Sequence, residues 1–260
     1  MNERSWLTRG ALALVLLFLL GPFVVIFVAG FSGDETLRFP PQTWSWRWIA
    51  HVFTVESFQR SLVTSLVVAF GSTLAALALG VPVAYALARS TLRGAEAVRL
   101  ALTLPLVVPG IIVGLALLNH GVLALQWPVT PALLVGHTTL LVPYAVRVVS
   151  GSLANLRADI DDAAVTLGAT RLQAFRLVVL PNIRGGVAAA FVLSFITSFN
   201  QVPVSLFLTG PGVSTLPIEM MAYMETSYDP SIAALSTLLV LFTLTLVALT
   251  ERLLGISKYI

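Results

Sequence analysis

Long apolar stretches without charged residues dominate the pattern of the chain. No Asp, Glu, Lys or Arg occurs in five windows, residues 10–33, 61–88, 100–146, 185–218 and 230–250. A membrane-spanning helix needs about 20 consecutive apolar residues, so the window 100–146 is long enough for two, with a turn expected at Asn119-His120 and Gln126–Pro131. The pattern predicts six spanning helices, near Ala11–Phe31, Leu62–Leu87, Leu100–Leu118, Ala132–Val149, Val187–Leu208 and Ile232–Leu249.

The spans are predicted to be helical. Strands of a membrane barrel alternate apolar and polar residues, whereas runs such as Ala13–Leu20 are continuously apolar. Only 10% of the residues are charged, against about 25% in a soluble protein, so the chain lacks the surface of a soluble domain. We predict an all-α polytopic membrane protein with one transmembrane domain over residues 1–260, an N-terminal span at 11–31 and core spans within 62–254.

The positive charges predict the orientation, because Lys and Arg concentrate in cytoplasmic loops. Twelve of the fifteen basic residues fall on the side of the N-terminus: Arg4, Arg9, Arg89, Arg93, Arg99, Arg147, Arg157, Arg171, Arg176, Arg184, Arg252 and Lys258. Both termini are therefore expected in the cytoplasm. The alternative, that residues 11–31 are a cleaved signal peptide, is less favoured because the apolar run exceeds the usual 7–15 residues.

One cytoplasmic segment, residues 157–183, is long enough for structure of its own. Three aspartates, at 159, 161 and 162, occupy the expected first turn of a helix, where carboxylates oppose the macrodipole. Gly168 is a typical C-terminal residue of a helix. Thr170 and Gln173 match the capping box of a second helix, which we expect to end at Pro181.

This pair of short helices has two possible roles. An amphipathic helix on the lipid surface would carry cations around a large apolar face. Here Ala163 and Ala164 stand beside acidic residues, which favours docking into a groove on another protein.

The segment Asp162-Ala-Ala-Val-Thr-Leu-Gly168, followed by Leu180-Pro181, resembles the EAA loop of binding-protein-dependent ABC importer permeases. The family has Glu where Asp162 stands. In that family the loop forms the coupling helix of a type I importer fold and docks on the ATPase subunit. The resemblance implies ATPase-coupling positions at Asp159, Asp162, Ala163, Ala164, Gly168, Ala169, Phe175 and Pro181.

Further segments resemble the second permease subunit of the spermidine/putrescine branch. They are Val192–Gln201, Thr209–Gly212, Thr215–Pro217 and Asp229–Thr237. The resemblance implies import of a small polar solute, a polyamine or a related amine or amino acid derivative. It also implies as partners an ABC ATPase dimer, a second homologous permease in a heterodimer, and a periplasmic or extracellular solute-binding protein. The expected location of such a subunit is the inner (plasma) membrane of a bacterial cell.

Polar residues inside the spans are candidates for the solute path, because exposing them to lipid is costly. We select Tyr144, Ser198, Asn200 and Gln201. The resembled permeases tend to carry acids where Asn200 and Gln201 stand. The alternative role for such residues is hydrogen bonding between helices, and this is also the expected role of His137, which lacks neighbours at metal-ligand spacing.

No catalytic motif is present. The sequence contains neither a P-loop nor a zinc-protease helix, so we expect no catalytic or metal residues and no cofactor in this chain, with ATP and Mg bound by a separate ATPase. The distribution of its basic residues fits insertion into a bilayer rather than binding to a nucleic acid. The alternative function is a self-contained secondary transporter, which would carry intramembrane ionisable groups and internal repeats.

Overall fold

The computed structural model describes residues 3–89, 94–157 and 159–254. Arg93 and Lys258, which were counted for the orientation, lie outside the described residues, as does the side chain of Arg4. In the described ranges the protein is all-α, as predicted. The β-type pairing within these ranges is limited to two isolated bridges, Ser32 with Trp44 and Gly210 with Val213.

Four helices of the described residues are long and apolar enough to cross a membrane, and up to six spans result if each of two bent pairs counts as one. The long helices match four predicted spans. They are α1 (Glu3–Gly30), α3 (Glu56–Ala88), α6 (Val129–Ala154) and α12 (Ser231–Leu254).

The predicted third span is broken. Helix α4 (Ala95–Val107) and the helix formed by α5 (Gly110–Ala116) and η1 (Leu117–Ala124) meet at an angle of 86°. Pro109 explains the break, because a residue before proline avoids the helical region, and Val108 is extended with ψ 123°. Asn119 and His120 were expected in the following turn but lie within the π-helical η1, where each side chain contacts a carbonyl four residues back. The turn comes later, with Gln126 at φ 56°.

The predicted fifth span is shorter than expected. Helix α10 covers Arg184–Phe199, and the remaining residues to Leu208 form an irregular segment with one 3₁₀ turn, η3 (Ser205–Phe207). Pro203 cannot donate the backbone hydrogen bond that a helix interior requires. The segment Asn200–Val204 is therefore free to line a site instead of continuing the span.

The chain divides into two compact units. Unit 1 comprises residues 1–59 and 219–244, and unit 2 comprises residues 60–218 and 245–260. Helix α2 (Arg47–Val52) precedes residues 60–218 of unit 2 in the sequence, and α11 (Leu216–Thr226) begins at their end.

In unit 1, the end of α1 packs closely on the start of α12. A Cβ on Gly30 would lie 2.6 Å from Thr237 Oγ1, so glycine permits this approach. Trp44 and Trp46 are exposed, whereas Trp48 is buried and donates from Nε1 to the carbonyl of Asp34 at 2.8 Å. Asp229 accepts from the Tyr223 hydroxyl at 2.8 Å and from the backbone N–H of Ser231 at 2.9 Å, which fixes the beginning of α12.

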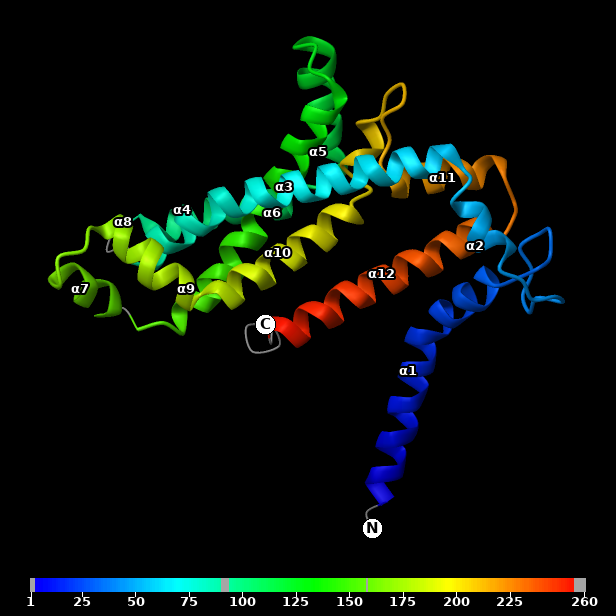
Figure 1. Ribbon diagram of the computed structural model, residues 1–260, viewed down its shortest axis with the longest axis horizontal. Helices are drawn as coiled ribbons and strands as arrows, with labels where there is room; N and C mark the ends of the chain where they lie inside the picture. The colour runs from blue at the N-terminus through cyan, green and yellow to red at the C-terminus, as the bar shows by residue number, and fades with distance from the viewer. Residues whose placement is uncertain (1–2, 90–93, 158, 255–260) are drawn as a thin grey trace. The chain divides into compact units, whose positions relative to one another are not determined.

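In unit 2, α10 packs along α6 and both contact α3 (Figure 1). The core that joins them also includes two residues from the predicted cytoplasmic segment. Its buried members are Leu77, Val81, Ala84, Leu87, Ala145, Val146, Val149, Leu153, Val179, Ile183 and Ala190. The cytoplasmic segment is therefore anchored in the helix core at its C-terminal end.

Candidate functional site

The predicted cytoplasmic segment folds as a pair of short helices, as expected. Helix α7 covers Asp159–Thr166 with its three aspartates in the first turn. Gly168 adopts φ +98°, a conformation that residues with a Cβ rarely adopt. Thr170 and Gln173 form the complete predicted capping box of α8 (Arg171–Ala174). Local sequence signals therefore define this element correctly.

The prediction that the second helix ends at Pro181 is correct to within one residue. Helix α8 continues through the π-helical η2 (Phe175–Val179) and α9 (Leu180–Asn182), so it ends at Asn182. The π turn was not predicted. The Asn182 side chain donates to the carbonyl of Val178 at 2.7 Å. The helix direction changes after Asn182, where α10 begins at an angle of 73°.

The predicted coupling positions differ in exposure. Asp159, Asp162, Ala163, Gly168 and Pro181 are exposed, and Ala164 and Ala169 are half-buried. Phe175 instead turns inward, with its ring 4.8 Å from that of Tyr85 in α3. Most of the predicted coupling positions that a partner can reach therefore lie on the surface of α7 and its following turn.

Two ion pairs lie on that surface. Arg157 donates from Nε to Asp159 Oδ1 at 3.1 Å, and Arg171 donates to Asp162 Oδ1 at 2.9 Å. The hydrogen bond from Arg157 holds the pKa of Asp159 below its usual range. Both pairs are solvent-exposed, so they contribute little to stability and leave the acids accessible to a partner.

Sequence reasoning missed two features of this element. Leu167, at the end of α7, is 89% exposed, and its place immediately before Gly168 in the motif could have indicated it. Asp161 is buried and accepts from Arg89 Nε, just beyond α3, at 2.8 Å. No spacing rule connects residues 72 positions apart, so this tie between α7 and α3 emerges from the tertiary structure alone.

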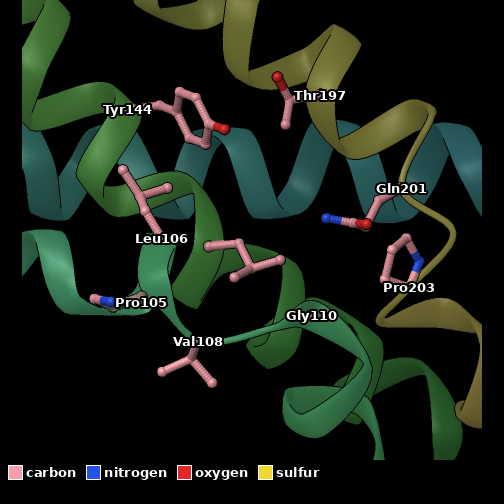
Figure 2. Close-up of a pocket in the computed structure, with 9 residues that line it drawn as sticks. Pro105, Leu106, Val108, Gly110, Tyr144, Thr197, Gln201 and Pro203 are labelled. Carbon is pink, nitrogen blue, oxygen red and sulfur yellow. The ribbon is translucent and has the colours of Figure 1, made fainter.

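A pocket of about 170 Å³ lies where α4 breaks and α10 ends. Figure 2 shows Tyr144 from α6 and Gln201 from the segment after α10 reaching into this space. The lining residues are Pro105, Leu106, Val108, Gly110, Leu140, Tyr144, Thr197, Gln201 and Pro203. Two of the four predicted path residues, Tyr144 and Gln201, therefore share one pocket.

The partial charges in this pocket come from helix ends rather than from charged side chains. None of the described residues that line it is charged. The last turns of α4 and α10 both contribute to its wall, through Pro105 and Leu106 and through Thr197. A helix C-terminus carries the equivalent of roughly half a negative charge. One N-terminus, that of α5 at Gly110, also lines the pocket and carries the opposite partial charge. Two C-terminal ends outnumber it, and together with the Tyr144 ring they favour a cation.

The other two predicted path residues lie elsewhere. The Asn200 amide donates to the carbonyl of Ile196 at 2.9 Å and does not line the pocket. Ser198 is 4% exposed, and its hydroxyl contacts His137 Nδ1 at 2.8 Å and the Ser72 hydroxyl at 3.0 Å. The prediction that His137 hydrogen-bonds neighbouring elements is confirmed, and Ser198 takes part in the same contact between helices.

Known proteins resemble this chain in sequence. Residues 76–257 match the model of the family described as "Binding-protein-dependent transport system inner membrane component". The putrescine transport system permease protein PotI of Escherichia coli (strain K12) is 31% identical over 229 residues, covering 85% of this chain and 81% of that protein. The spermidine/putrescine transport system permease protein PotC of Haemophilus influenzae is 27% identical over 253 residues, covering 96% of each.

Solved structures show the same fold. A bacterial ABC transporter involved in import of the acidic polysaccharide alginate has a chain that superposes with a TM-score of 0.70 at 17% identity, covering 97% of this chain and 98% of that one. A chain of the MetNI methionine ABC transporter gives 0.63 at 20% identity, covering 76% and 94%. The type I importer permease fold implied by the Asp162–Gly168 motif is thus confirmed, and the chain belongs to the family of inner membrane components of binding-protein-dependent transport systems.

Proposed function

We propose that this permease subunit forms the membrane path for a small organic cation of the polyamine class, through the pocket between α4, α6 and the end of α10. Membership of the family makes the chain a transport subunit of an ABC importer, not an enzyme, and disfavours a secondary transporter. The observation that carries the proposal is the convergence of two helix C-termini on Tyr144 and Gln201.

The chemistry of the pocket suits an ammonium group. The Gln201 amide oxygen and the two helix ends supply acceptors, and the Tyr144 ring supplies a face for a cation. The volume of about 170 Å³ far exceeds the roughly 10–15 Å³ that one water molecule needs. The PotI and PotC relatives are named for putrescine and spermidine, which supports the same class of solute.

The assembly that we propose follows the family. A dimer of ATPase subunits binds ATP and Mg and docks on α7, a second permease completes the path as a heterodimer, and a binding protein delivers the solute from outside. Both termini face the cytoplasm. We expect this chain to bind no cofactor. Differential binding of α7 to two states of the ATPase would then shift the permease between two conformations.

A lysine at position 201 tests the pocket. With the complex in proteoliposomes, Gln201→Lys is expected to lower putrescine uptake at least tenfold, because two like charges about 4 Å apart repel by several kcal/mol near a protein surface. Gln201→Glu should retain uptake. Asn200→Lys is the matched control, since Asn200 is adjacent but lies outside the pocket. Equal uptake by Gln201→Lys and wild type would remove this pocket from the path.

Leu167 tests the ATPase contact. Burying a leucine at an interface stabilises it by about 1.5–3 kcal/mol. Leu167→Ser should therefore weaken retention of the ATPase roughly ten- to hundredfold, measured by co-purification and by ATP-dependent uptake. Leu125→Ser, which alters another exposed leucine (64% exposed) in the predicted outer turn, should leave retention unchanged. Uptake by this chain without any ATPase would instead restore the secondary-transporter hypothesis.

A further inference from the structure

His137 is buried at the centre of a chain of hydroxyl groups in unit 2. The residue is 1% exposed, and its two ring nitrogens contact different elements. Nδ1 lies 2.8 Å from Ser198 Oγ in the last turn of α10, and Nε2 lies 3.0 Å from Ser205 Oγ in η3. The imidazole therefore bridges the two ends of the irregular segment between residues 198 and 205.

The hydrogen bonds of this chain are all satisfied in one consistent arrangement. Ser72 donates to the carbonyl of Val68 at 2.6 Å, and Ser198 donates to Ser72 across 3.0 Å. Because a hydroxyl has one proton to donate, Ser198 then accepts from His137 Nδ1–H. His137 Nε2 then accepts from the Ser205 hydroxyl. A neutral imidazole meets both demands at once, which neither an aliphatic side chain nor a second serine could do.

The bridged segment forms one wall of the pocket. Gln201 and Pro203 line the pocket, and the next residue, Val204, is fully buried. A Cβ on Gly114 would lie 2.6 Å from the Val204 carbonyl, and one on Gly136 would lie 2.8 Å from Val204 Cγ1. The backbone of Val204 therefore packs directly on α5, and its side chain packs directly on the backbone of α6.

We infer that His137 is a positioning residue that clamps the segment 198–205 and so holds Gln201 in the pocket. This inference rests on the proposed function for its role in transport, but the clamp itself is a property of the fold. The Ser205 bond is the decisive one, because the Ser198 end is already held by α10 and by the bond from the Gln201 N–H to the Ser198 carbonyl at 3.1 Å. The Ser205 end belongs only to the short 3₁₀ turn η3.

A single thiol probe tests the clamp without transport. The chain has no cysteine, so Gln201→Cys provides a unique site, in a complex whose partner cysteines have been replaced. Losing one buried hydrogen bond costs enough to raise local opening about tenfold. The rate of maleimide labelling at position 201 should therefore rise about tenfold with Ser205→Ala or His137→Asn. Thr139→Ala, on the exposed face of the same helix, should not change it.

His137→Gln is the conservative rescue, because its amide oxygen can take the place of Nε2 and accept from Ser205. Its labelling rate should stay close to that of the parent. An unchanged rate with Ser205→Ala would overturn the clamp, and so would equal increases in all variants, since that would indicate general loosening of the helix bundle.

A double-mutant cycle connects the clamp to transport. If Ser205 acts through Gln201, then Ser205→Ala should lower kcat/KM for putrescine in the parent but cause no further loss in Gln201→Ala. If the two substitutions instead lower kcat/KM independently, so that their fold losses multiply, Ser205 does not act through Gln201. If labelling responds to Ser205→Ala while Gln201→Lys leaves uptake unchanged, the clamp stands and the pocket function fails, so the two hypotheses are separable.

Discussion

Asp161→Ala is expected to release α7 from α3 and to uncouple ATP hydrolysis from transport. Asp161 is buried and its Arg89 partner is 20% exposed, with 2.8 Å between Nε and Oδ2. Removing one member of a buried ion pair typically costs about 3–5 kcal/mol, because the other charge stays buried without compensation. Local opening of α7 should therefore increase by at least a hundredfold.

Amide hydrogen exchange of residues 160–167 in the assembled complex measures this opening. Arg157→Gln is the matched control, since it breaks an ion pair of the same helix that is fully solvent-exposed, and we expect little change in exchange. Protection of α7 that is equal in Asp161→Ala and wild type would show that the pair does not hold this helix.

Gly186→Ala is expected to destabilise the contact between α6 and α10 by about 1–3 kcal/mol, the usual cost of overpacking a core. An added Cβ at Gly186 would overlap the Cβ and Oγ of Ser152, although it would lie 3.8 Å from Ser152 Cα. Both residues are buried, so neither side chain can move into solvent. The midpoint of thermal unfolding of the detergent-solubilised complex should fall accordingly.

The same contact predicts a specific suppressor. Ser152→Gly removes both overlapping atoms and leaves a contact at ordinary van der Waals distance, so the double variant should recover most of the lost stability. Gly151→Ala is the control, because a Cβ at Gly151 meets nothing within 4 Å. A double variant as unstable as Gly186→Ala would show that the overlap is not the cause.

Much of the fold follows from local sequence signals. Charge-free windows predict four spans well, because a long apolar helix needs no tertiary partner to be recognised. The breaks at Val108 and after Phe199 depend on how Pro109 and Pro203 are accommodated by packing, and hydropathy does not record this. The π turn of η2 within the second helix also escaped prediction, since a π turn has no compositional signature.

The parts of the candidate site that depend on contacts local in the sequence could be predicted, and the parts that depend on distant contacts could not. Gly168 and the capping pair Thr170–Gln173 act within a few residues, and the sequence indicates them correctly. The grouping of Tyr144 with Gln201 could be predicted only as a pair of polar residues in separate spans. The bonds of Asp161 with Arg89 and of His137 with Ser205 join residues 72 and 68 positions apart, and a single sequence carries no signal for such pairs.

The chain bends by 73° after Asn182, and this bend, the elbow, joins the coupling element to α10. Ile183, at the elbow, is 1% exposed and fixed in the core with Val179. Helix α10 extends from this elbow over 16 residues, or about 24 Å at 1.5 Å per residue. A rotation of about 5° at the elbow would move the far end of α10 by about 2 Å, since displacement grows with the length of the arm. A small movement imposed on α8 would thus be amplified at Phe199, where the pocket wall begins.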